Sequence, residues 1–164
     1  MSSQQQGLLP KLRIGARLLR RGMNLWPPFV GARIHVTRIA EDFREVEVTM
    51  KLGLSNRNYF GTHFGGSLYA MTDPFYALMM LNNLGPDYVV WDRAGAIRYD
   101  APARGQVWAR FRITATDIAR ARKATASGDK YEPTFRATIV DRGGRKLAHV
   151  ERTLYIRRRA AASS

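Results

Sequence analysis

The sequence predicts an α+β domain in which an antiparallel sheet wraps around one long central helix. The segment from about 65 to 84 is apolar on almost every side of a helical projection, and Gly85-Pro86 end it. It is too long for a strand, so we expect a buried helix. The alternating segments around it have no crossover helices between them, which favours antiparallel pairing. A chain of 164 residues, 45% of them hydrophobic, is sized for one such core.

Strands are expected where apolar residues recur at every second position. The clearest case is 45–52, where Val46, Val48, Met50 and Leu52 alternate with charged or hydroxyl side chains. Further strands are predicted over 34–36, 89–101, 107–113, 135–139 and 146–156, with a hairpin turn at 142–145 and a short helix capped by Thr116-Asp117 that ends near Ala126. These segments follow one another without repeats or linkers.

An amphipathic helix is predicted ahead of the sheet, over residues 8–26. Its apolar stripe steps by four or three residues through Leu12, Ala16, Leu19, Met23 and Trp26, and Pro27-Pro28 end it. We favour a helix packed on the domain's own sheet, because the stripe holds bulky core-type residues. A helix that lies on a membrane surface is the alternative, which liposome binding by a chain without residues 1–26 would test.

The expected domain organisation is simple. We expect a disordered tail over residues 1–7, a single domain over 8–157 that includes the N-terminal helix, and a basic, flexible tail over 158–164.

The net charge of +14 points to an anionic partner or to simple solubility. Nucleic acid, anionic lipid, an acidic carrier protein and a nucleotide-bearing substrate all fit such a charge. We expect no nucleic-acid partner, because no basic-aromatic binding motif stands out. The absence of cysteine excludes disulfides and thiolate metal sites, and the three histidines lack metal-ligand spacing, so we expect no metal. We expect a cytoplasmic protein.

One carboxylate stands out within the predicted central helix. Asp73 is the only charged residue between His63 and Asp87, and Gly65-Gly66 precede it. A carboxylate in apolar surroundings is costly to bury unless it is paired, protonated or used in chemistry. A buried acid bonded to the backbone or to an arginine is the structural alternative. Pro74 is expected to kink the helix just after Asp73.

The residues around this acid carry a resemblance to a known family. The segment Asn58-Tyr59-Phe60-Gly61-Thr62-His63-Phe64-Gly65-Gly66, followed by Leu68 and Asp73, resembles the signature of hotdog-fold thioesterases, especially their PaaI-like branch. Residues 94–105 resemble that branch's next strand and turn, and 143–156 its final hairpin. Residues 30–157 look most like an uncharacterised hotdog family known only as a domain of unknown function. The resemblance implies a hotdog fold, acyl-CoA thioesterase activity, no cofactor beyond the coenzyme A of the substrate, and a homodimer or dimer of dimers.

The resemblance also implies site residues. Gly65 falls where the family has its oxyanion-hole glycine, Asp73 where it has its catalytic acid, and Asn58 where it has an active-site asparagine; Gly66 shares the helix start with Gly65. The chain departs from the family at Phe64, where the family has histidine, and His63 is displaced by one position. The expected substrate contacts are His63, Phe64, Thr72, Phe75, Tyr76 and Asp92. The alternatives are plain core for the aromatic residues, a loop backbone bond for His63 and an ordinary surface acid for Asp92.

Simple physics connects these residues to hydrolysis of a thioester. Free backbone N–H groups at a helix start can hold a developing oxyanion, and an acid in apolar surroundings suits a general base or a nucleophile. Gly66 and Asp73 are seven residues apart, or about 10 Å along a helix, so one carbonyl cannot touch both in one subunit. The sequence therefore predicts a site between two subunits of a two-fold dimer.

Two other functions stay open. The chain could bind an acyl-CoA or a fatty acid without turnover, or it could be a hotdog dehydratase or hydratase. Thr62-His63-Phe64 resembles the Gly-His-Phe of the acyl-carrier-protein dehydratases, but Ala77 stands where those enzymes have their acid.

Overall fold

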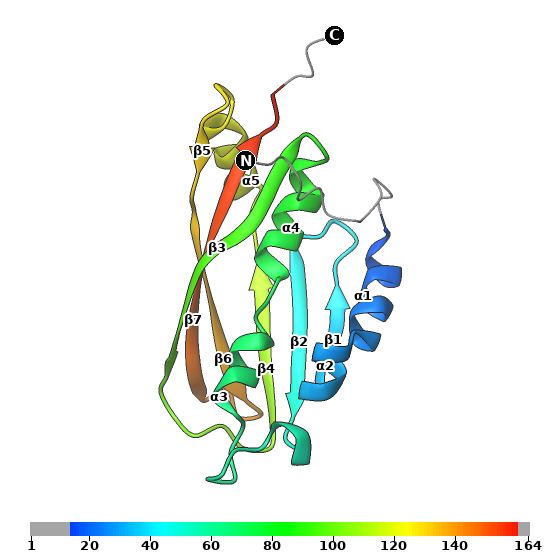
Figure 1. Cartoon of the computed structure of the whole chain (residues 1–164), viewed down its shortest axis with the longest axis vertical. Helices are drawn as coiled ribbons and strands as arrows, with labels where there is room; N and C mark the ends of the chain where they lie inside the picture. The colour runs from blue at the N-terminus through cyan, green and yellow to red at the C-terminus, as the bar shows by residue number, and fades with distance from the viewer. Residues whose placement is uncertain (1–13, 161–164) are drawn as a thin grey trace, which may run out of the picture.

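The computed structural model of the chain describes residues 14–160 (Figure 1). The predicted tail over 1–7, residues 8–13 of the predicted N-terminal helix and the last four residues of the predicted basic tail lie outside the described residues. In the described part, a single antiparallel sheet holds β1 (Ile34–Ile39), β2 (Glu45–Lys51), β4 (Gln106–Arg112), β6 (Thr134–Asp141), β7 (Lys146–Arg158) and β3 (Tyr88–Tyr99), in that spatial order. The two-residue β5 (Lys130–Tyr131), which the sequence pattern did not indicate, pairs with the end of β7.

The central helix is divided in two. The sequence predicts one helix over about 65–84, whereas the structure has α3 (Gly65–Ala70) and α4 (Phe75–Leu84), separated by Met71, Thr72, Asp73 and Pro74. The predicted kink at Pro74 is therefore a full break, because proline lacks the N–H that would continue the helix. The fold class is confirmed: the sheet curves around α3 and α4 (Figure 1).

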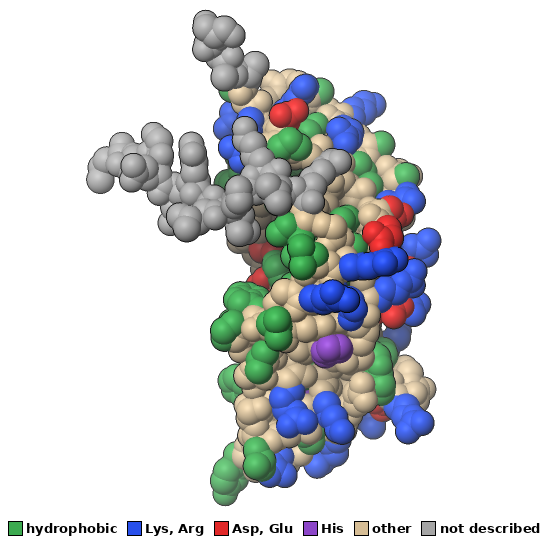
Figure 2. All heavy atoms as spheres, turned by 90° about the vertical axis from the view of Figure 1, so that its right-hand side faces the viewer, with side chains coloured by type: hydrophobic (Ala, Val, Ile, Leu, Met, Phe, Trp, Pro, Cys, Tyr) green, Lys and Arg blue, Asp and Glu red, His purple; other side chains and the backbone are tan. Residues whose placement is uncertain are grey.

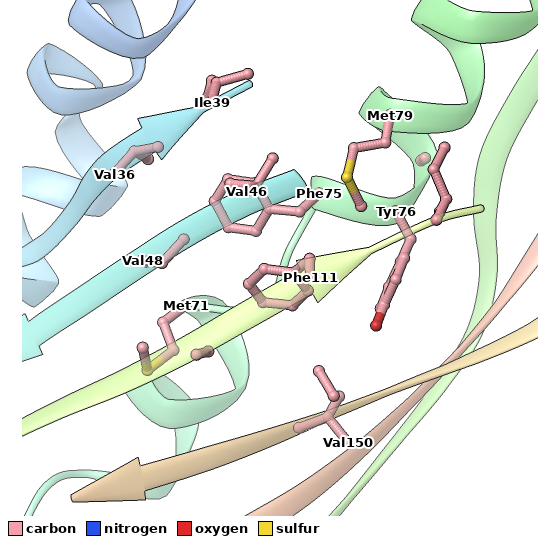
Figure 3. Packing of buried hydrophobic residues seen from close by; sticks show 14 of the residues in the cluster. Val36, Ile39, Val46, Val48, Met71, Phe75, Tyr76, Met79, Phe111 and Val150 are labelled. Carbon is pink, nitrogen blue, oxygen red and sulfur yellow. The ribbon is translucent and has the colours of Figure 1, made fainter. Parts of the chain in front are cut away.

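The core fills the space between α4 and the concave face of the sheet. Figure 3 shows Phe75, Tyr76 and Met79 of α4 facing apolar side chains of β2 and β4, including Val46 and Phe111. These residues are buried, at 3% exposure or less. Burial on nearly all sides explains why the sequence of this helix shows no polar face.

The N-terminal helix is shorter than predicted and is followed by a second one. α1 (Ala16–Leu25) ends before Pro27-Pro28, and these prolines begin α2 (Pro27–Ala32), a position that suits their fixed φ angle. The Asn24 side chain anchors α1 to β1, since it donates to the Val36 carbonyl at 3.0 Å and accepts from the Val36 N–H at 2.7 Å. α1 thus packs on the domain's own sheet. Membrane contact through residues 8–26 remains a prediction; no helix among residues 14–160 is long and apolar enough to cross a membrane.

The remaining elements differ from the prediction only at their ends. The helix after β4, α5 (Ala115–Ala124), is capped by Thr114 rather than by Thr116-Asp117. Thr114 and Asp117 form a capping box, in which each side chain accepts from the other's backbone N–H. β3 ends at Tyr99 and contains an irregularity between Asp92 and Ala94. β3 is also an edge strand, so one side of its backbone has no neighbour in the described chain.

Candidate functional site

One face of α3 lines a cavity. Gly66, Tyr69, Ala70 and Asp73 follow one another at intervals of three, one and three residues, which places them on one side of the helical turns. The cavity has a volume of about 310 Å³, and the α1–α2 connection and β7 supply the rest of its lining. The lining residues are Trp26, Pro28, Phe29, Gly66, Tyr69, Ala70, Asp73 and Arg152. Aromatic rings and one pair of opposite charges thus share a small space.

Asp73 lies at the break between α3 and α4, not inside a buried helix. Its side chain is 51% exposed, and Oδ2 lies 3.4 Å from Nη1 of Arg152. The prediction of apolar surroundings on every side of Asp73 was wrong, because it was based on one continuous helix. The break turns the carboxylate out of the core and toward the cavity. An acid paired with an arginine was the structural alternative, and this contact is present.

Arg152 is the site residue that sequence reasoning missed. It occupies an inward-facing position of β7 between Val150 and Leu154 and is only 4% exposed. Nη2 donates to the Tyr69 carbonyl at 3.2 Å and to Oγ1 of Thr72 at 3.0 Å, and the guanidinium carbon lies 4.1 Å from the centre of the Tyr69 ring. The signal available in the sequence was a charged residue at a position of the strand where the alternation predicts an apolar, inward-facing one.

Asp92 of β3 is half-buried and lies near this pair of charges. Burial raises the pKa of Asp92, the neighbouring Asp73 carboxylate raises that pKa further, and the Arg152 guanidinium lowers it. Two acids therefore compete for one cation. Asp92 is close enough to Asp73 for the two charges to interact, but it is not among the residues that line the cavity.

The start of α3 presents two glycines at the other end of the cavity. No acceptor among the described residues takes the backbone N–H of Gly65 or Gly66, while the next two N–H groups bond to the Phe64 carbonyl. A Cβ on Gly66 would overlap the Phe64 ring, and a Cβ on Gly65 would lie 2.8 Å from the Tyr99 hydroxyl. Tyr99 of β3 also donates to the Gly65 carbonyl at 2.9 Å. A side chain at either position would therefore displace one of these half-exposed rings.

Asn58 and His63 shape the loop before α3 and do not line the cavity. The Asn58 amide donates to Thr62 Oγ1 at 2.9 Å and to the His63 carbonyl at 3.2 Å, and its oxygen accepts two backbone N–H groups of the same loop. His63 is 2% exposed, and its Nε2 lies 2.9 Å from the Gly105 carbonyl. Burial lowers the pKa of His63, and the contact with Gly105 raises it in part. Within one chain, Asn58 bonds to its own loop, and His63 connects that loop to Gly105 in the turn before β4.

Asn56 was also missed, and it connects this loop to α2. It is 1% exposed, and its amide donates to the Ala32 carbonyl at 2.7 Å and to the Lys51 carbonyl at 3.1 Å. Its own carbonyl accepts the Phe64 N–H at 2.7 Å. The end of α2 is thereby connected to the start of α3, where Gly66 lines the cavity.

Two of the three aromatic residues expected to contact the substrate, Phe75 and Tyr76, belong to the core. The Phe75 ring packs between Phe29 and Phe111, with centroid distances of 6.1 and 4.9 Å. The Tyr76 hydroxyl donates to the Arg136 carbonyl at 2.6 Å, and burial raises the pKa of Tyr76 to about 12. Both side chains point into the packed interior (Figure 3). Their place in the second helix, after the break, explains the difference.

Thr72 and Phe64 lie next to the cavity without being part of its lining. Thr72 is 1% exposed, and its hydroxyl donates to the Tyr69 carbonyl at 2.7 Å while it accepts from Arg152. Phe64 is 57% exposed and covers Gly66. Thr72 thus supports the arginine rather than contacting a ligand.

Positive charge is distributed widely and is not concentrated at the cavity. Figure 2 shows Lys and Arg side chains spread over the face it displays rather than gathered in one patch.

A larger cleft of about 710 Å³ is lined by Arg104, Gly105, Gln106, Trp108, Asp141, Arg142 and Gly143. It contains none of the predicted site residues. Among residues 14–160, no group of three or more His, Asp or Glu side chains could hold a metal ion.

Comparisons with known proteins agree with this architecture. The model of a family described as a domain of unknown function (DUF4442) matches residues 15–156. The protein PA5026 of Pseudomonas aeruginosa, described as of unknown function and a probable thioesterase, is similar at 16% identity with a TM-score of 0.76, over 91% of this chain and 99% of that one. The thioesterase HI1161 of Haemophilus influenzae is similar at 15% identity and 0.67, over 94% and 98%.

A third structure links the fold to the branch that the sequence resembles. The E. coli PaaI protein, from the phenylacetic acid degradation operon, is similar at 12% identity with a TM-score of 0.57, over 87% of this chain and 91% of that one. No curated protein matches the chain. At sequence identities this low, the similarity shows a shared fold and nothing more. The predicted hotdog fold is thereby confirmed.

Proposed function

We propose, from the premise that the chain belongs to the family described as a domain of unknown function (DUF4442), that it hydrolyses acyl thioesters of coenzyme A. One observation carries the proposal. The Asp73 carboxylate opens into a cavity that also reaches Gly66 at the start of α3 and is partly walled by aromatic rings. The similarity to structures described as thioesterases supports the reaction class.

The proposed chemistry uses both ends of α3. Asp73 takes a proton from a water molecule, whose oxygen bonds to the thioester carbonyl carbon, or the carboxylate attacks that carbon itself. The carbonyl oxygen becomes an oxyanion, which the unpaired N–H groups of Gly65 and Gly66 stabilise. The C–S bond then breaks, and coenzyme A leaves as its thiolate. When water is the nucleophile, the acyl group is released as the free acid. When the carboxylate is the nucleophile, the acyl group stays on Asp73 as an anhydride, which a water molecule then hydrolyses to release the acid and restore the carboxylate. Neither a metal nor a further cofactor is needed for these steps.

The spacing of the two groups leads us to propose a homodimer with shared sites. Gly66 and Asp73 are seven residues apart, a spacing of about 10 Å at the rise of a helix. Helix-like turns continue from the end of α3 to Asp73, whose N–H bonds to the Ala70 carbonyl, so a spacing of this order applies across the break. One carbonyl therefore needs Gly66 from one chain and Asp73 from another. The free edge of β3, a strand of 12 residues that carries the exposed Trp91 and Tyr99, offers a surface for a second copy to extend the sheet.

Mixing two inactive variants tests this shared site. Gly66→Val blocks the approach of the carbonyl, and Asp73→Asn removes the base. In a mixed dimer, one of the two shared sites keeps both groups, so an equal mixture that exchanges subunits is expected to regain about a quarter of wild-type activity. Activity is measured after the chains exchange, with light scattering to check the dimer. If both groups act within one chain, the mixture stays inactive.

The cavity limits the acyl group that it can hold. A volume of about 310 Å³ lies at the lower end for ligand pockets, so we expect short acyl chains or a single ring. Ala70 lines the cavity, and Ala70→Leu adds methyl groups inside it. For the longest accepted substrate, kcat/KM is expected to fall about tenfold or more, because one methylene in a pocket has an effect of that size.

A panel of acyl-CoA lengths measures this effect, with Ala119→Leu as the control. Ala119 is an exposed alanine of α5 and does not line the cavity. We expect its variant to keep the wild-type length preference. An equal loss in both variants, or no loss in Ala70→Leu, would contradict the assignment of the cavity to the acyl group.

Binding without turnover is the second candidate, and the chain's Phe64 favours it. The histidine of the resembled family is missing at this position, and Asp73 is engaged by Arg152. The same panel separates the candidates. Release of free coenzyme A supports hydrolysis, tight binding without release supports an acyl carrier or sensor, and hydration of a crotonyl-type thioester supports a hydratase.

A further inference from the structure

Arg152 is fixed by contacts that reach well beyond its ion pair. Its side chain is 95% buried, in the inward row of β7. Nη2 bonds to the Tyr69 carbonyl at the end of α3 and to the Thr72 hydroxyl in the break, and Nη1 contacts Asp73. One rigid guanidinium therefore spans the segment in which the central helix changes direction, and it has little freedom to move away from the carboxylate.

A glycine of β3 makes room for this arrangement. Gly95 pairs with Arg152 in the register of β3 and β7. A Cβ at Gly95 would overlap the Tyr69 hydroxyl and would lie 3.3 Å from Cδ of Arg152. The Tyr69 ring stacks on the guanidinium only because this space is open. Three elements of the fold thus cooperate to hold one arginine.

The arginine is also the positive charge next to two acids. Among the described residues, the titratable groups around Asp73 are Arg152 from β7, Asp92 from β3 and Tyr69 from α3. Within residues 14–160, the cavity lining from α2 and the residue before it consists of Trp26, Pro28 and Phe29, none of which carries a charge. Without Arg152, the Asp73 and Asp92 carboxylates would lose the cation that lowers the pKa of Asp92, and like charges favour a bound proton.

We propose that Arg152 is a positioning residue for the reaction: it orients the Asp73 carboxylate toward the cavity and offsets the repulsion between Asp73 and Asp92. The inference rests on the proposed function, because it assigns Asp73 the role of base or nucleophile. A base must be ionised to act, and a misplaced one reacts slowly. Arg152 serves both requirements without touching the substrate.

Two variants separate orientation from charge. Arg152→Met removes the charge and the donors, and Arg152→Lys keeps the charge but loses the planar fork. In Arg152→Met, we expect kcat to fall by about 100-fold, because the Asp73 carboxylate loses the group that holds it in place. We also expect the acidic limb of the kcat/KM profile to move to higher pH, because the Asp73 and Asp92 carboxylates then repel each other without a cation beside them. Arg152 also lowers the pKa of Asp92, so that pKa is expected to rise in the same variant. In Arg152→Lys, we expect a lower kcat with the acidic limb near its wild-type position.

A second readout does not depend on turnover. The carboxyl ¹³C signal of Asp92 in the full-length protein is expected to titrate at higher pH in Arg152→Met than in the wild type. Arg136→Met is the matched control, because Arg136 forms an exposed pair with Glu151 and lies away from the cavity. Arg136→Met should shift neither the acidic limb of the kcat/KM profile nor the carboxyl signal of Asp92. Thr72→Val removes one support of Arg152 and gives a milder test if Arg152→Met does not fold.

The outcomes distinguish the two proposals. If wild-type protein does not hydrolyse any thioester but the Asp92 signal shifts as expected, the proposed function fails and the coupling of charges stands. The positioning role is wrong if wild-type protein hydrolyses thioesters, Arg152→Met loses activity equally at every pH, and the Asp92 signal does not shift. Thr72→Val replaces Arg152→Met in this comparison if Arg152→Met does not fold. A general loss of stability would lower activity equally at every pH and would not shift the Asp92 signal.

Discussion

Asp73→Asn is expected to lower kcat for thioester hydrolysis by about 10²- to 10⁴-fold, because an amide can neither take a proton from water nor attack the carbonyl. The fold should be unaffected. The Asp73 side chain is 51% exposed, and an amide oxygen can still accept from Arg152 at the same place. Arg152 is 95% buried but keeps its bonds to the Tyr69 carbonyl and the Thr72 hydroxyl, so we expect the free energy of unfolding to fall by about 1–3 kcal/mol, the range for weakening a hydrogen bond to a charged group. Steady-state kinetics and urea unfolding of the same preparations measure both quantities.

A carboxylate elsewhere on the surface provides the control for this substitution. Asp87 is exposed, follows α4, and does not line the cavity. Asp87→Asn changes the net charge by the same amount and is expected to keep wild-type kcat. Unchanged turnover in Asp73→Asn would refute the assignment of this acid. Loss in both variants would indicate a dependence on overall charge instead.

The sheet and its order of elements could be predicted because their signals are local. Alternation along 45–52 places Val46, Val48 and Met50 inward, and all three are fully buried in the structure. The buried helix was equally visible, since a polar face is missing over about 65–84. The proline predicted a kink at this point, but the apolar pattern could not show that the helix breaks completely before Phe75, because the residues on both sides of the break are apolar. α3 faces the cavity in part, while α4 fills the core.

This break decides which predicted residues reach the site. Asp73 and Gly66 share one cavity because they stand seven positions apart, two turns along the same side of α3 and its extension. Phe75 and Tyr76 follow the break and turn into the core. The local sequence could not separate the residues of the cavity from the residues of the core, since both sets belong to one apolar segment. Only the orientation of α4 against the sheet distinguishes them.

Arg152 shows a different reason for failure. Its strand was predicted correctly, and its position within the alternation of Val150, Leu154 and Ile156 marks it as inward-facing. Its partners Tyr69, Thr72 and Asp73 lie about 80 residues earlier in the chain, as the hydrogen bonds record. A pair of buried charges can be suspected from a charged residue at an apolar position. The identity of the partner is fixed by the tertiary fold alone.

Phe75→Ala is expected to lower the free energy of unfolding by about 3–5 kcal/mol, the range for deleting a large buried aromatic side chain. Phe75 is 0% exposed and packs between the rings of Phe29 and Phe111, so truncation leaves a cavity at the centre of the core (Figure 3). For a chain of this size, such a loss corresponds to a fall in Tm of about 10 °C. Urea unfolding without ligand measures the effect, since a residue needed only for an acyl contact would show little of it.

The same truncation at an exposed ring is the control for this prediction. Phe60 lies in the loop before α3 and is 79% exposed, so Phe60→Ala removes the same atoms without opening a buried space. We expect it to change the free energy of unfolding by about 0.5 kcal/mol or less, as for other surface substitutions. If Phe75→Ala costs no more than Phe60→Ala and instead weakens acyl-CoA binding, then Phe75 belongs to the ligand pocket. The second helix would then face the substrate, and the cavity along α3 would be only part of the site.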